Sequence, residues 1–426
     1  MKMTRSEQLA VFSLSAIMSL RMVGLFMALP VFSLYALKLV NATPTLIGVA
    51  IGIYGLTQAL FQIPFGALSD HIGRKPIILA GLFIFIVGSL TCGMAHSIYT
   101  VIVGRSLQGV GAVGSATLAM IADLTREEKR TFSMAIVGMT IGVSFAIAMF
   151  LGPILVPWIA LRGLFFMAAL FGMIAIILLM TVTPTPTHSG NPIALFRSKP
   201  RRINLKSFFK LIISPELAKL NIGIFILHAV FTASFVIIPI NLDHFASLPA
   251  NEQWKIYLPA LIIALPISLF CIRLAEHKHQ LKRYFLGSII TLAIAEYLLW
   301  IAAKNMIFMT IGLCLFFSGF SLLEAFLPSL ISRTAPLARK GSALGLYASA
   351  QFLGIFVGGL SGGWLYGQFG FSIVFLFCIS LILLWLAIAY FMRAPHYLPT
   401  HTTMITPSTT STSHHPDFIR LKEPLQ

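Results

Sequence analysis

Long runs of apolar residues alternate with short polar stretches along almost the whole chain. Each run is close to the roughly 20 residues that an α-helix needs to cross the hydrocarbon core of a bilayer. Twelve such runs are present, at residues 9–37, 45–69, 76–94, 98–122, 132–155, 163–182, 218–242, 254–274, 284–303, 306–331, 341–366 and 371–393. The pattern predicts an all-α integral membrane protein with twelve transmembrane helices.

The longest connection between runs lies mid-chain and divides the helices into two sets of six. This pattern is typical of transporters built from two related bundles, with the substrate site near the membrane midplane. We expect a six-helix bundle at 1–182, a cytoplasmic linker at 183–217, a second bundle at 218–393 and a disordered, Ser/Thr-rich cytoplasmic tail at 394–426. The linker is basic and carries an apolar stripe, which fits either an interfacial helix or a flexible connection.

Composition agrees with a membrane protein. Of the 426 residues, 58% are hydrophobic and 10% are charged, whereas soluble domains carry roughly 25% charged residues. The 4 Cys residues fall singly within apolar runs. None has metal-binding or redox spacing, so we interpret them as packing residues.

The net charge of +17 is explained by topology. With both termini on one side of the membrane, that side holds 24 of the 30 Lys and Arg residues and the other side holds 4. The remaining two, Arg21 and Arg105, lie inside apolar runs. Because basic residues collect on the cytoplasmic side of membrane proteins, we expect a multi-pass protein of a cell membrane with both termini in the cytoplasm. Nucleic acid is not an expected partner.

A short charged turn at 66–78 joins the second and third runs. Asp70 precedes two basic residues by four and five positions, and two glycines allow the backbone to bend or to approach a neighbour. The turn fits either an ordinary cytoplasmic loop or a gating element. Its distinctive residues are Gly66, Leu68, Asp70, Gly73, Arg74 and Lys75.

These residues match the strong positions of the loop 2–3 signature of the major facilitator superfamily, G-x-L-a-D-r-x-G-r-k-x-x-l, which the turn resembles. The resemblance implies a charge relay among Asp70, Arg74 and an acid at the end of span 4, here Asp123. It also implies that Asp70 meets the N-terminal end of span 11, near Gly341, because a helix N-terminus stabilises a carboxylate. We expect a latch that holds the two halves together on the cytoplasmic side. His71 stands where the family usually has Arg, and we hypothesise that it makes the latch pH-sensitive.

Two further motifs resemble signatures of this superfamily. Residues 104–112 in span 4 (GRSLQGVGA) are similar to R-x-x-Q-G-x-G. Gly152 and Pro153 in span 5 are similar to the core of G-x-x-x-G-P-x-x-G-G, the signature of drug/proton antiporters. Ala148 stands in place of the first glycine, and Val156 with Pro157 replaces the paired glycines.

Residues 5–395 are most similar to YajR-type proton-dependent transporters of bacteria, on the phrases at 51–59, 326–332 and 349–354. Such proteins often add a small cytoplasmic α/β domain after span 12. Since 32 residues follow Ala394, we expect that domain to be absent. Glycines four residues apart in span 11 predict close helix packing surfaces, and they are Gly354, Gly358 and Gly362 in one row and Gly359 and Gly363 in another.

Five ionisable residues lie inside the apolar runs, where charge is costly and a functional role is the first expectation. Four of them fall one each on spans 1, 4, 7 and 10, namely Arg21, Arg105, His228 and Glu324. In the superfamily these spans line the central cavity, so the resemblance implies that the four residues share an aqueous translocation path. The fifth, Glu296, lies on the usually peripheral span 9, and we interpret it as a structural partner.

Glu324 is the first candidate for a proton carrier, because desolvation disfavours a carboxylate and lets it gain a proton near neutral pH. A fixed salt bridge to Arg21 or another base is the alternative. His228 is the second candidate, since imidazole titrates near neutral pH, and a hydrogen bond between helices is its alternative. Arg21 and Arg105 keep their charge and are expected to hold an anionic group or tune a carboxylate. For Arg105 a structural role in its motif is equally consistent.

The motifs exclude the common enzyme classes. The sequence GVGAVG at 109–114 fits a dinucleotide-binding pattern but lies mid-membrane without a preceding strand. Neither G-x-x-x-x-G-K-[ST] nor H-E-x-x-H occurs in the chain. We therefore expect neither an enzyme nor a cofactor.

Together these features predict a monomeric, proton-coupled secondary transporter that works by alternating access and exports a lipophilic or amphipathic small molecule by antiport. Its expected partners are that small-molecule substrate, protons and the lipid bilayer. A metabolite or sugar permease and a membrane sensor without turnover are the alternatives.

Overall fold

A computed structural model describes residues 3–184, 214–244, 247–278, 280–302, 305–336 and 340–392. Within these residues the chain is helical, without a strand and with one isolated bridge between Val40 and Ser97. Most of the predicted linker, at 185–213, and the whole predicted tail lie outside the described residues.

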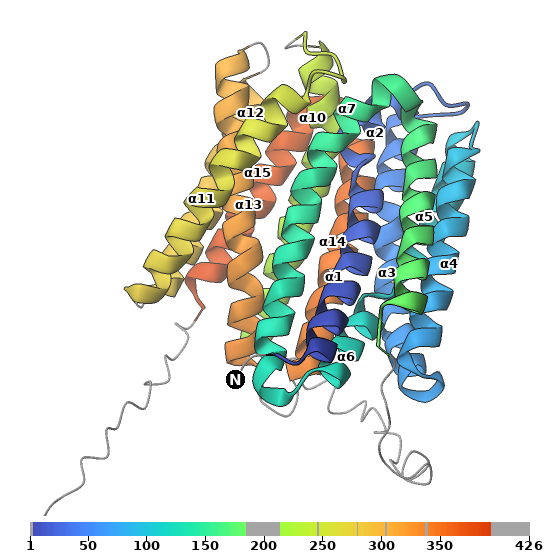
Figure 1. Cartoon of the computed structure of the whole chain (residues 1–426). Helices are drawn as coiled ribbons and strands as arrows, with labels where there is room; N and C mark the ends of the chain where they lie inside the picture. Colours follow the sequence, from blue (N-terminus) through green and yellow to red (C-terminus); the bar gives the residue numbers. More distant parts are fainter. Residues whose placement is uncertain are drawn as a thin grey trace, which may run out of the picture. The chain divides into compact units, whose positions relative to one another are not determined.

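The helices follow the predicted apolar runs (Figure 1). The first half of the chain forms α1 (Arg5–Phe26), α2 (Leu29–Ala36), α3 (Pro44–Ile72), α4 (Arg74–Gly93), α5 (Ile98–Val110), α6 (Gly114–Leu124) and α7 (Glu127–Thr181). The second half forms α10 (Pro215–His244), α11 (Trp254–His277), α12 (Leu281–Ile301), α13 (Met306–Thr334), α14 (Lys340–Phe369) and α15 (Phe371–Tyr390).

Polar residues begin several helices where the apolar runs start. The side chains of Thr43 and Ser97 accept hydrogen bonds from backbone N–H groups in the first turns of α3 and α5. Asn305 does the same for α13. Pro44 occupies the start of α3, where its missing N–H costs nothing. Such caps satisfy groups that the helix leaves without partners.

Helix α7 crosses the membrane twice. It has 55 residues and would be about 80 Å long if straight, whereas the hydrocarbon core is about 30 Å thick. Ala160 breaks the helix with φ 53° and ψ 178°, and the chain reverses there (Figure 1). The described residues contain eleven helical segments able to span a membrane, α7 among them. Counting α7 twice confirms the twelve predicted crossings.

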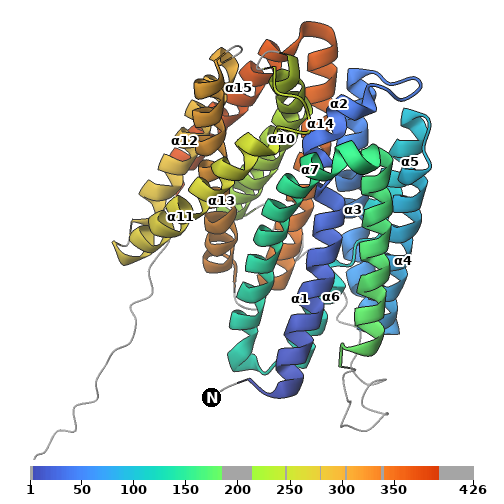
Figure 2. The same ribbon diagram turned by 45° about the horizontal axis from the view of Figure 1, so that its top comes forward.

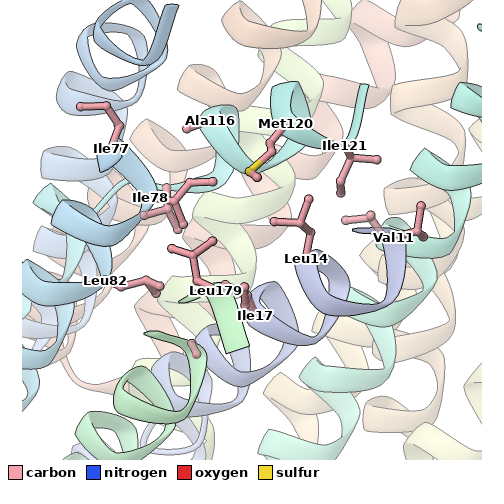
Figure 3. Close-up of a cluster of buried hydrophobic side chains, with 13 residues drawn as sticks. Val11, Leu14, Ile17, Ile77, Ile78, Leu82, Ala116, Met120, Ile121 and Leu179 are labelled. Carbon is pink, nitrogen blue, oxygen red and sulfur yellow. The ribbon is translucent and has the colours of Figure 1, made fainter. Parts of the chain in front are cut away.

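Fully buried apolar side chains from four helices meet in the N-terminal half (Figure 3). Leu14 and Ile17 of α1 pack with Ile78 of α4, Met120 of α6 and Leu179 of α7. Each of these side chains is 0% exposed. This core fixes the position of α1, which carries Arg21.

Helix α10 is the most enclosed element of the C-terminal half. Every residue from Ile226 to Leu242 is buried, because α10 packs against α13, α14 and α15. A polar side chain on this stretch therefore faces other helices and not lipid, which is the setting of His228.

The two halves meet where α3 crosses α14, and the contact is backbone against backbone (Figure 2). A Cβ atom on Gly48 would lie 2.1 Å from the carbonyl oxygen of Gly359, and one on Gly359 would lie 2.5 Å from that of Gly48. A Cβ on Gly363 would lie 2.4 Å from the carbonyl oxygen of Pro44. Only glycine permits an approach this close.

A second glycine row on α14 packs against α10. Cβ atoms on Gly354 and Gly358 would lie 2.2 and 2.1 Å from carbonyl oxygens of Phe225 and Ala229. The two glycine rows predicted as packing surfaces are thus confirmed, and they use different neighbours. Helix α14 joins the halves while remaining tightly packed in its own.

Toward the α3–α4 turn the two helices separate. Positions for a Cβ on Gly341 and Gly345 of α14 have no described atom within 4 Å. On α3, Leu60 and Ile72 are 60% and 58% exposed. The junction of the halves is therefore closed at one end and open at the end that carries the charged turn.

We predict that Gly48→Leu lowers the temperature of thermal unfolding, because the new side chain would collide with the backbone of α14. Overpacking of this kind costs about 1–3 kcal/mol. Gly345→Leu serves as the control, since open space surrounds that position. Thermal unfolding of the purified variants measures the effect, and equal unfolding temperatures would contradict a tight crossing.

Candidate functional site

The five ionisable residues predicted inside the membrane occupy separate places. Arg21 on α1 and Arg105 on α5 lie within the N-terminal half, at 0% and 5% exposure. His228 on α10 and Glu324 on α13 lie together in the C-terminal half. Glu296 on α12 is 0% exposed and has a different partner. The structure therefore brings together two of the four residues predicted to share a pathway.

His228 and Glu324 form an acid–base pair between α10 and α13. Nε2 of His228 lies 3.5 Å from Oε1 of Glu324, an ion-pair distance when the imidazole is protonated. Among the described residues this carboxyl oxygen has no hydrogen-bond partner. The side chain of His228 is 8% exposed and that of Glu324 is 32% exposed. Glu324 is thus the member of the pair whose side chain is more accessible.

Gln351 of α14 completes the group and was missed by the sequence reasoning. Its side-chain nitrogen lies 2.9 Å from Nε2 of His228. With the amide nitrogen as donor, the imidazole nitrogen accepts, which corresponds to the neutral ring. An amide also offers an acceptor oxygen, so Gln351 can pair with either protonation state of His228. An uncharged polar residue in the middle of an apolar run was the available signal.

Four phenylalanines from both halves, here called the aromatic cluster, lie beside the pair: Phe26, Phe145, Phe231 and Phe320. The rings of Phe231 and Phe320 are 4.8 Å apart, and Phe320 lies 5.6 Å from the imidazole of His228. Phe145 of α7 lies 5.6 Å from Phe231 and 5.4 Å from Phe26 of α1. The aromatic cluster therefore bridges the two halves next to the ionisable pair.

Arg105 ties three elements of the N-terminal half together. Its guanidinium donates to the carbonyl oxygens of Ala50 and Ile51 on α3 and of Leu25 on α1, at 3.3 to 3.5 Å. It also donates to the side chain of Gln108 at 2.9 Å and lies 4.6 Å from the ring centroid of Tyr54. Every nitrogen of this guanidinium is therefore engaged in holding helices together.

The other residues of the R-x-x-Q-G-x-G stretch also hold helices of the N-terminal half together. Gln108 donates to Ser89 on α4 at 2.9 Å. A Cβ on Gly109 would lie 2.1 Å from Oγ1 of Thr57 and 2.2 Å from the carbonyl oxygen of Tyr54. The motif thus provides one residue for polar ties and one for close approach to α3.

Arg21 is buried without an acidic partner among the described residues. Nη2 donates to Gln58 at 3.1 Å, and the guanidinium carbon lies 5.7 Å from the ring centroid of Phe85. Nε and Nη1 have no hydrogen-bond partner in the part of the chain that the structure describes. The salt bridge from Arg21 to Glu324, considered as an alternative above, is absent from this structure, where Glu324 lies next to His228.

Glu296 lies between helices of the C-terminal half. Its Oε1 accepts a hydrogen bond from Ser234 of α10 at 2.6 Å, and that hydroxyl also lies 3.6 Å from Cys378 of α15. The side chain is 0% exposed. Its contacts are those of a group that joins α12 to its neighbours.

The charged turn is a network centred on Arg74. Arg74 forms an ion pair with Asp70 one helical turn earlier, and its Nε lies 3.0 Å from Oδ2 of Asp123 at the end of α6. Lys75 donates to the carbonyl oxygen of Thr183 at 3.3 Å. Gly73 has φ 107° between α3 and α4, a conformation that favours glycine. The turn therefore ties α3, α4 and the end of α6 together.

The contact expected between Asp70 and the N-terminal end of α14 is not formed in this structure. Asp70 is 60% exposed and is paired with Arg74. Gly341 at the start of α14 has no described neighbour within 4 Å of a Cβ position. His71 is exposed, and Gly66 lies against Ser115, with 3.2 Å from its Cβ position to Oγ. The absence of this predicted contact is in keeping with the separation of α3 and α14 at this end.

The residues of the antiporter-like stretch lie against the break between α1 and α2. A Cβ on Gly152 would lie 2.0 Å from the carbonyl oxygen of Met27. Pro153 and Ala148 are buried beside it. Gly152 thus lets α7 approach the point where α1 ends, and any larger residue would push the two elements apart.

An ion pair that the sequence reasoning missed secures the start of α1. Glu7 accepts from the backbone N–H of Thr4 in a capping box and from the guanidinium of Arg126 at 2.8 and 3.0 Å. The backbone N–H of Arg126 also donates to Glu7 at 3.0 Å. The Thr4-x-x-Glu7 spacing was the available signal. The pair joins α1 to the connection between α6 and α7.

The sequence profile of the Major Facilitator Superfamily matches this chain at residues 14–277 and 220–413. The chain belongs to the major facilitator superfamily. It is therefore a multi-pass membrane transporter and not an enzyme, as the charged turn and the division into six and six helices predicted.

Two relatives and one solved structure are similar to the chain over most of its length. It is 44% identical to the inner membrane transport protein YajR of Escherichia coli K12, over 93% of this chain and 86% of YajR. It is 35% identical to an uncharacterized transporter of Buchnera aphidicola subsp. Acyrthosiphon pisum, over 81% and 87% of the two chains. A bacterial homologue of the human lysosomal transporter Spinster, crystallised in an inward-facing and occupied conformation, has the same fold, with a TM-score of 0.73 at 14% identity over 93% and 99% of the chains.

We predict that Arg105→Lys destabilises the N-terminal half, because an ammonium group cannot reach carbonyls on two helices and a side-chain amide at once. Leaving buried acceptors without donors costs about 1–3 kcal/mol each. Thermal unfolding of the purified protein provides the measurement. Arg162→Lys, at an exposed position, is the matched control. An unchanged unfolding temperature for Arg105→Lys would exclude the structural role.

Proposed function

We propose that this transporter couples the export of a lipophilic or amphipathic small molecule to the entry of protons, by alternating access. It acts as a monomer in a bacterial inner membrane with both termini in the cytoplasm. The observation that supports this best is the His228–Glu324 pair beside the aromatic cluster, at the junction of the two halves.

The pair provides a place for a proton. The side chain of Glu324 is partly exposed. Its Oε1 is buried and has no hydrogen-bond partner among the described residues, so it can hold a proton on the His228 side without giving up an existing bond. The imidazole of His228 lies 3.5 Å away and can take up or share that proton. Gln351 stabilises His228 in either state by presenting its nitrogen or its oxygen.

The aromatic cluster favours an apolar or amphipathic substrate. Rings from both halves form one apolar surface, which binds hydrophobic or aromatic groups through burial and edge-to-face contacts. A sugar site requires many hydrogen-bond partners instead, and the ring contacts here offer none. A molecule bound among these rings lies close enough to Glu324 to favour one of its charge states over the other.

The ends of the α3–α14 junction fit one state of an alternating-access cycle. The excess of basic residues assigns the charged turn to the cytoplasm, so the open end faces inward and the glycine crossing closes the outside.

We retain Arg21 as a cavity residue, because two of its nitrogens lack partners among the described residues. We assign Arg105 to the structural role, because its nitrogens are all engaged.

The charged turn completes the cycle as a latch. When the cytoplasmic end closes, Asp70 comes to the N-terminal end of α14, whose partial positive charge stabilises its carboxylate. Protonation of Asp70, or its recapture by Arg74 as in this structure, releases the latch. His71, exposed next to Asp70, adds sensitivity to cytoplasmic pH.

We predict that Glu324→Gln abolishes substrate-dependent proton movement, because an amide cannot gain or lose a proton near neutral pH. Inside-out vesicles with an imposed pH gradient, given lipophilic cations, neutral drugs and sugars in turn, provide the measurement. Collapse of the gradient by a lipophilic compound is expected with the unaltered protein and not with Glu324→Gln.

Glu296→Gln is the matched control, since that carboxyl lies in the same half but is sealed between helices, and an amide still accepts from Ser234. It should retain the gradient collapse. Loss in Glu296→Gln with retention in Glu324→Gln would reverse the assignment. No collapse with any compound in well-folded protein would count against antiport, and collapse with sugars alone would favour a permease.

We further predict that Asp70→Asn reduces the population closed on the cytoplasmic side by about two- to fivefold, the value of one carboxylate at a helix N-terminus. Spin labels at Ile72 of α3 and Leu344 of α14, both exposed, report the distance across this end in protein without the native cysteines. The short-distance population should shrink in the variant.

The control for this measurement is Glu128→Gln, which removes an exposed acid at the start of α7. It should leave the distance distribution unchanged. An equal effect of both substitutions would mean that general charge, and not the latch, sets the population.

A further inference from the structure

A groove of about 400 Å³ lies on the C-terminal half, between α11 and α12 and above α13. It is separate from the His228–Glu324 pair and from the charged turn. Its lining residues are Cys271, Gln280, Arg283, Tyr284, Gly287, Ser288, Thr291 and Leu322. Most of them belong to the first half of α12, so the groove follows that helix for about 16 Å from Gln280 to Thr291.

The groove opens toward the lipid. Large apolar side chains on both flanking helices are exposed, with Leu269 and Phe270 of α11 at 57% and 66% and Ile290 and Ile294 of α12 at 45% and 48%. Helices α11 and α12 lie at the outer edge of the bundle in both Figure 1 and Figure 2, so these exposed apolar side chains face acyl chains. A molecule therefore reaches the groove from within the bilayer.

One end of the groove is polar and basic. Gln280, Arg283 and Tyr284 surround it at the start of α12, whose positive dipole end adds to the attraction for an anion. Arg283 is exposed and has no acidic partner among the described residues. The nearest acid in the sequence on α11, Glu276, lies 3.6 Å from Arg333. This end is on the side that the basic residues assign to the cytoplasm.

The other end of the groove has no charged lining residue, and it leaves open space beside α12. Ser288 and Leu322 are buried at its floor. The position of a Cβ on Gly287 has no described atom within 4 Å. A flexible apolar chain therefore has room along α12 without displacing any side chain.

We propose that this groove binds an anionic phospholipid. The phosphate lies on Arg283, with Gln280 and Tyr284 as further hydrogen-bond partners, and an acyl chain follows Gly287 and Thr291 over Leu322. Basic pockets between membrane helices on the cytoplasmic side recognise anionic lipid headgroups. The lipid-facing rims and the change from a basic to an uncharged lining along the groove select a lipid over a soluble anion.

Native mass spectrometry of the purified full-length protein tests the proposal, with dioleoyl phosphatidylglycerol and dioleoyl phosphatidylcholine added in equal amounts. The unaltered protein should retain phosphatidylglycerol preferentially. Arg283→Gln should lower that retention about fivefold, the effect of one basic residue at an anionic surface. Gly287→Leu should lower retention of both lipids by filling the groove, and it keeps the helix because leucine is the better helix former.

Arg273→Gln is the matched control, since Arg273 is an exposed basic residue of α11 that does not line the groove. It should leave retention unchanged. Equal losses of lipid retention in Arg273→Gln and Arg283→Gln would mean that general positive charge, and not this site, holds the lipid. That result would overturn the proposal. Equal retention of the two lipids by the unaltered protein would overturn headgroup recognition, and full retention in Gly287→Leu would place the lipid elsewhere.

Discussion

Helices α3 and α14 hold the two halves together through backbone atoms, and much of the structure depends on that contact. Gly48 and Gly359 remove the side chains that would keep the helices apart. Attraction between closely packed backbones then replaces the hydrophobic effect, which is weak between helices already in lipid. At the glycine end of the crossing the backbones touch directly, and further along α3 Tyr54 packs in one buried cluster with Ile355 of α14. The crossing also brings the rings of Phe145 and Phe231 within contact across the junction.

Buried charge is treated in two opposite ways in this protein. In the N-terminal half, Arg105 is surrounded by carbonyl oxygens and an amide, so its charge is compensated and fixed. In the C-terminal half, Glu324 and His228 lie at a distance too long for a good hydrogen bond, and one carboxyl oxygen has no partner. Compensated charge makes a rigid support, whereas uncompensated charge responds to a proton or a ligand. Arg21 also has two nitrogens without partners among the described residues, so the division runs between individual sites and not between the two halves.

The fold and the charged turn could be predicted from the sequence because both depend on local pattern. Apolar run length gives the crossings, and the spacing of Asp70 and Arg74 gives their ion pair. The partners of the buried residues could not be predicted, because they depend on how distant helices rotate against each other. The alternative for Glu324 was a salt bridge to Arg21 or another base, and the structure places it beside His228. Gln351 and the pairing of Glu7 with Arg126 were overlooked for the same reason.

The turn within α7 has a consequence for how the chain enters the membrane. Its two crossings are joined at Ala160 without an intervening loop, next to the exposed Trp158 and Arg162. With no loop between them, the fifth and sixth crossings can enter the bilayer together as one helical hairpin.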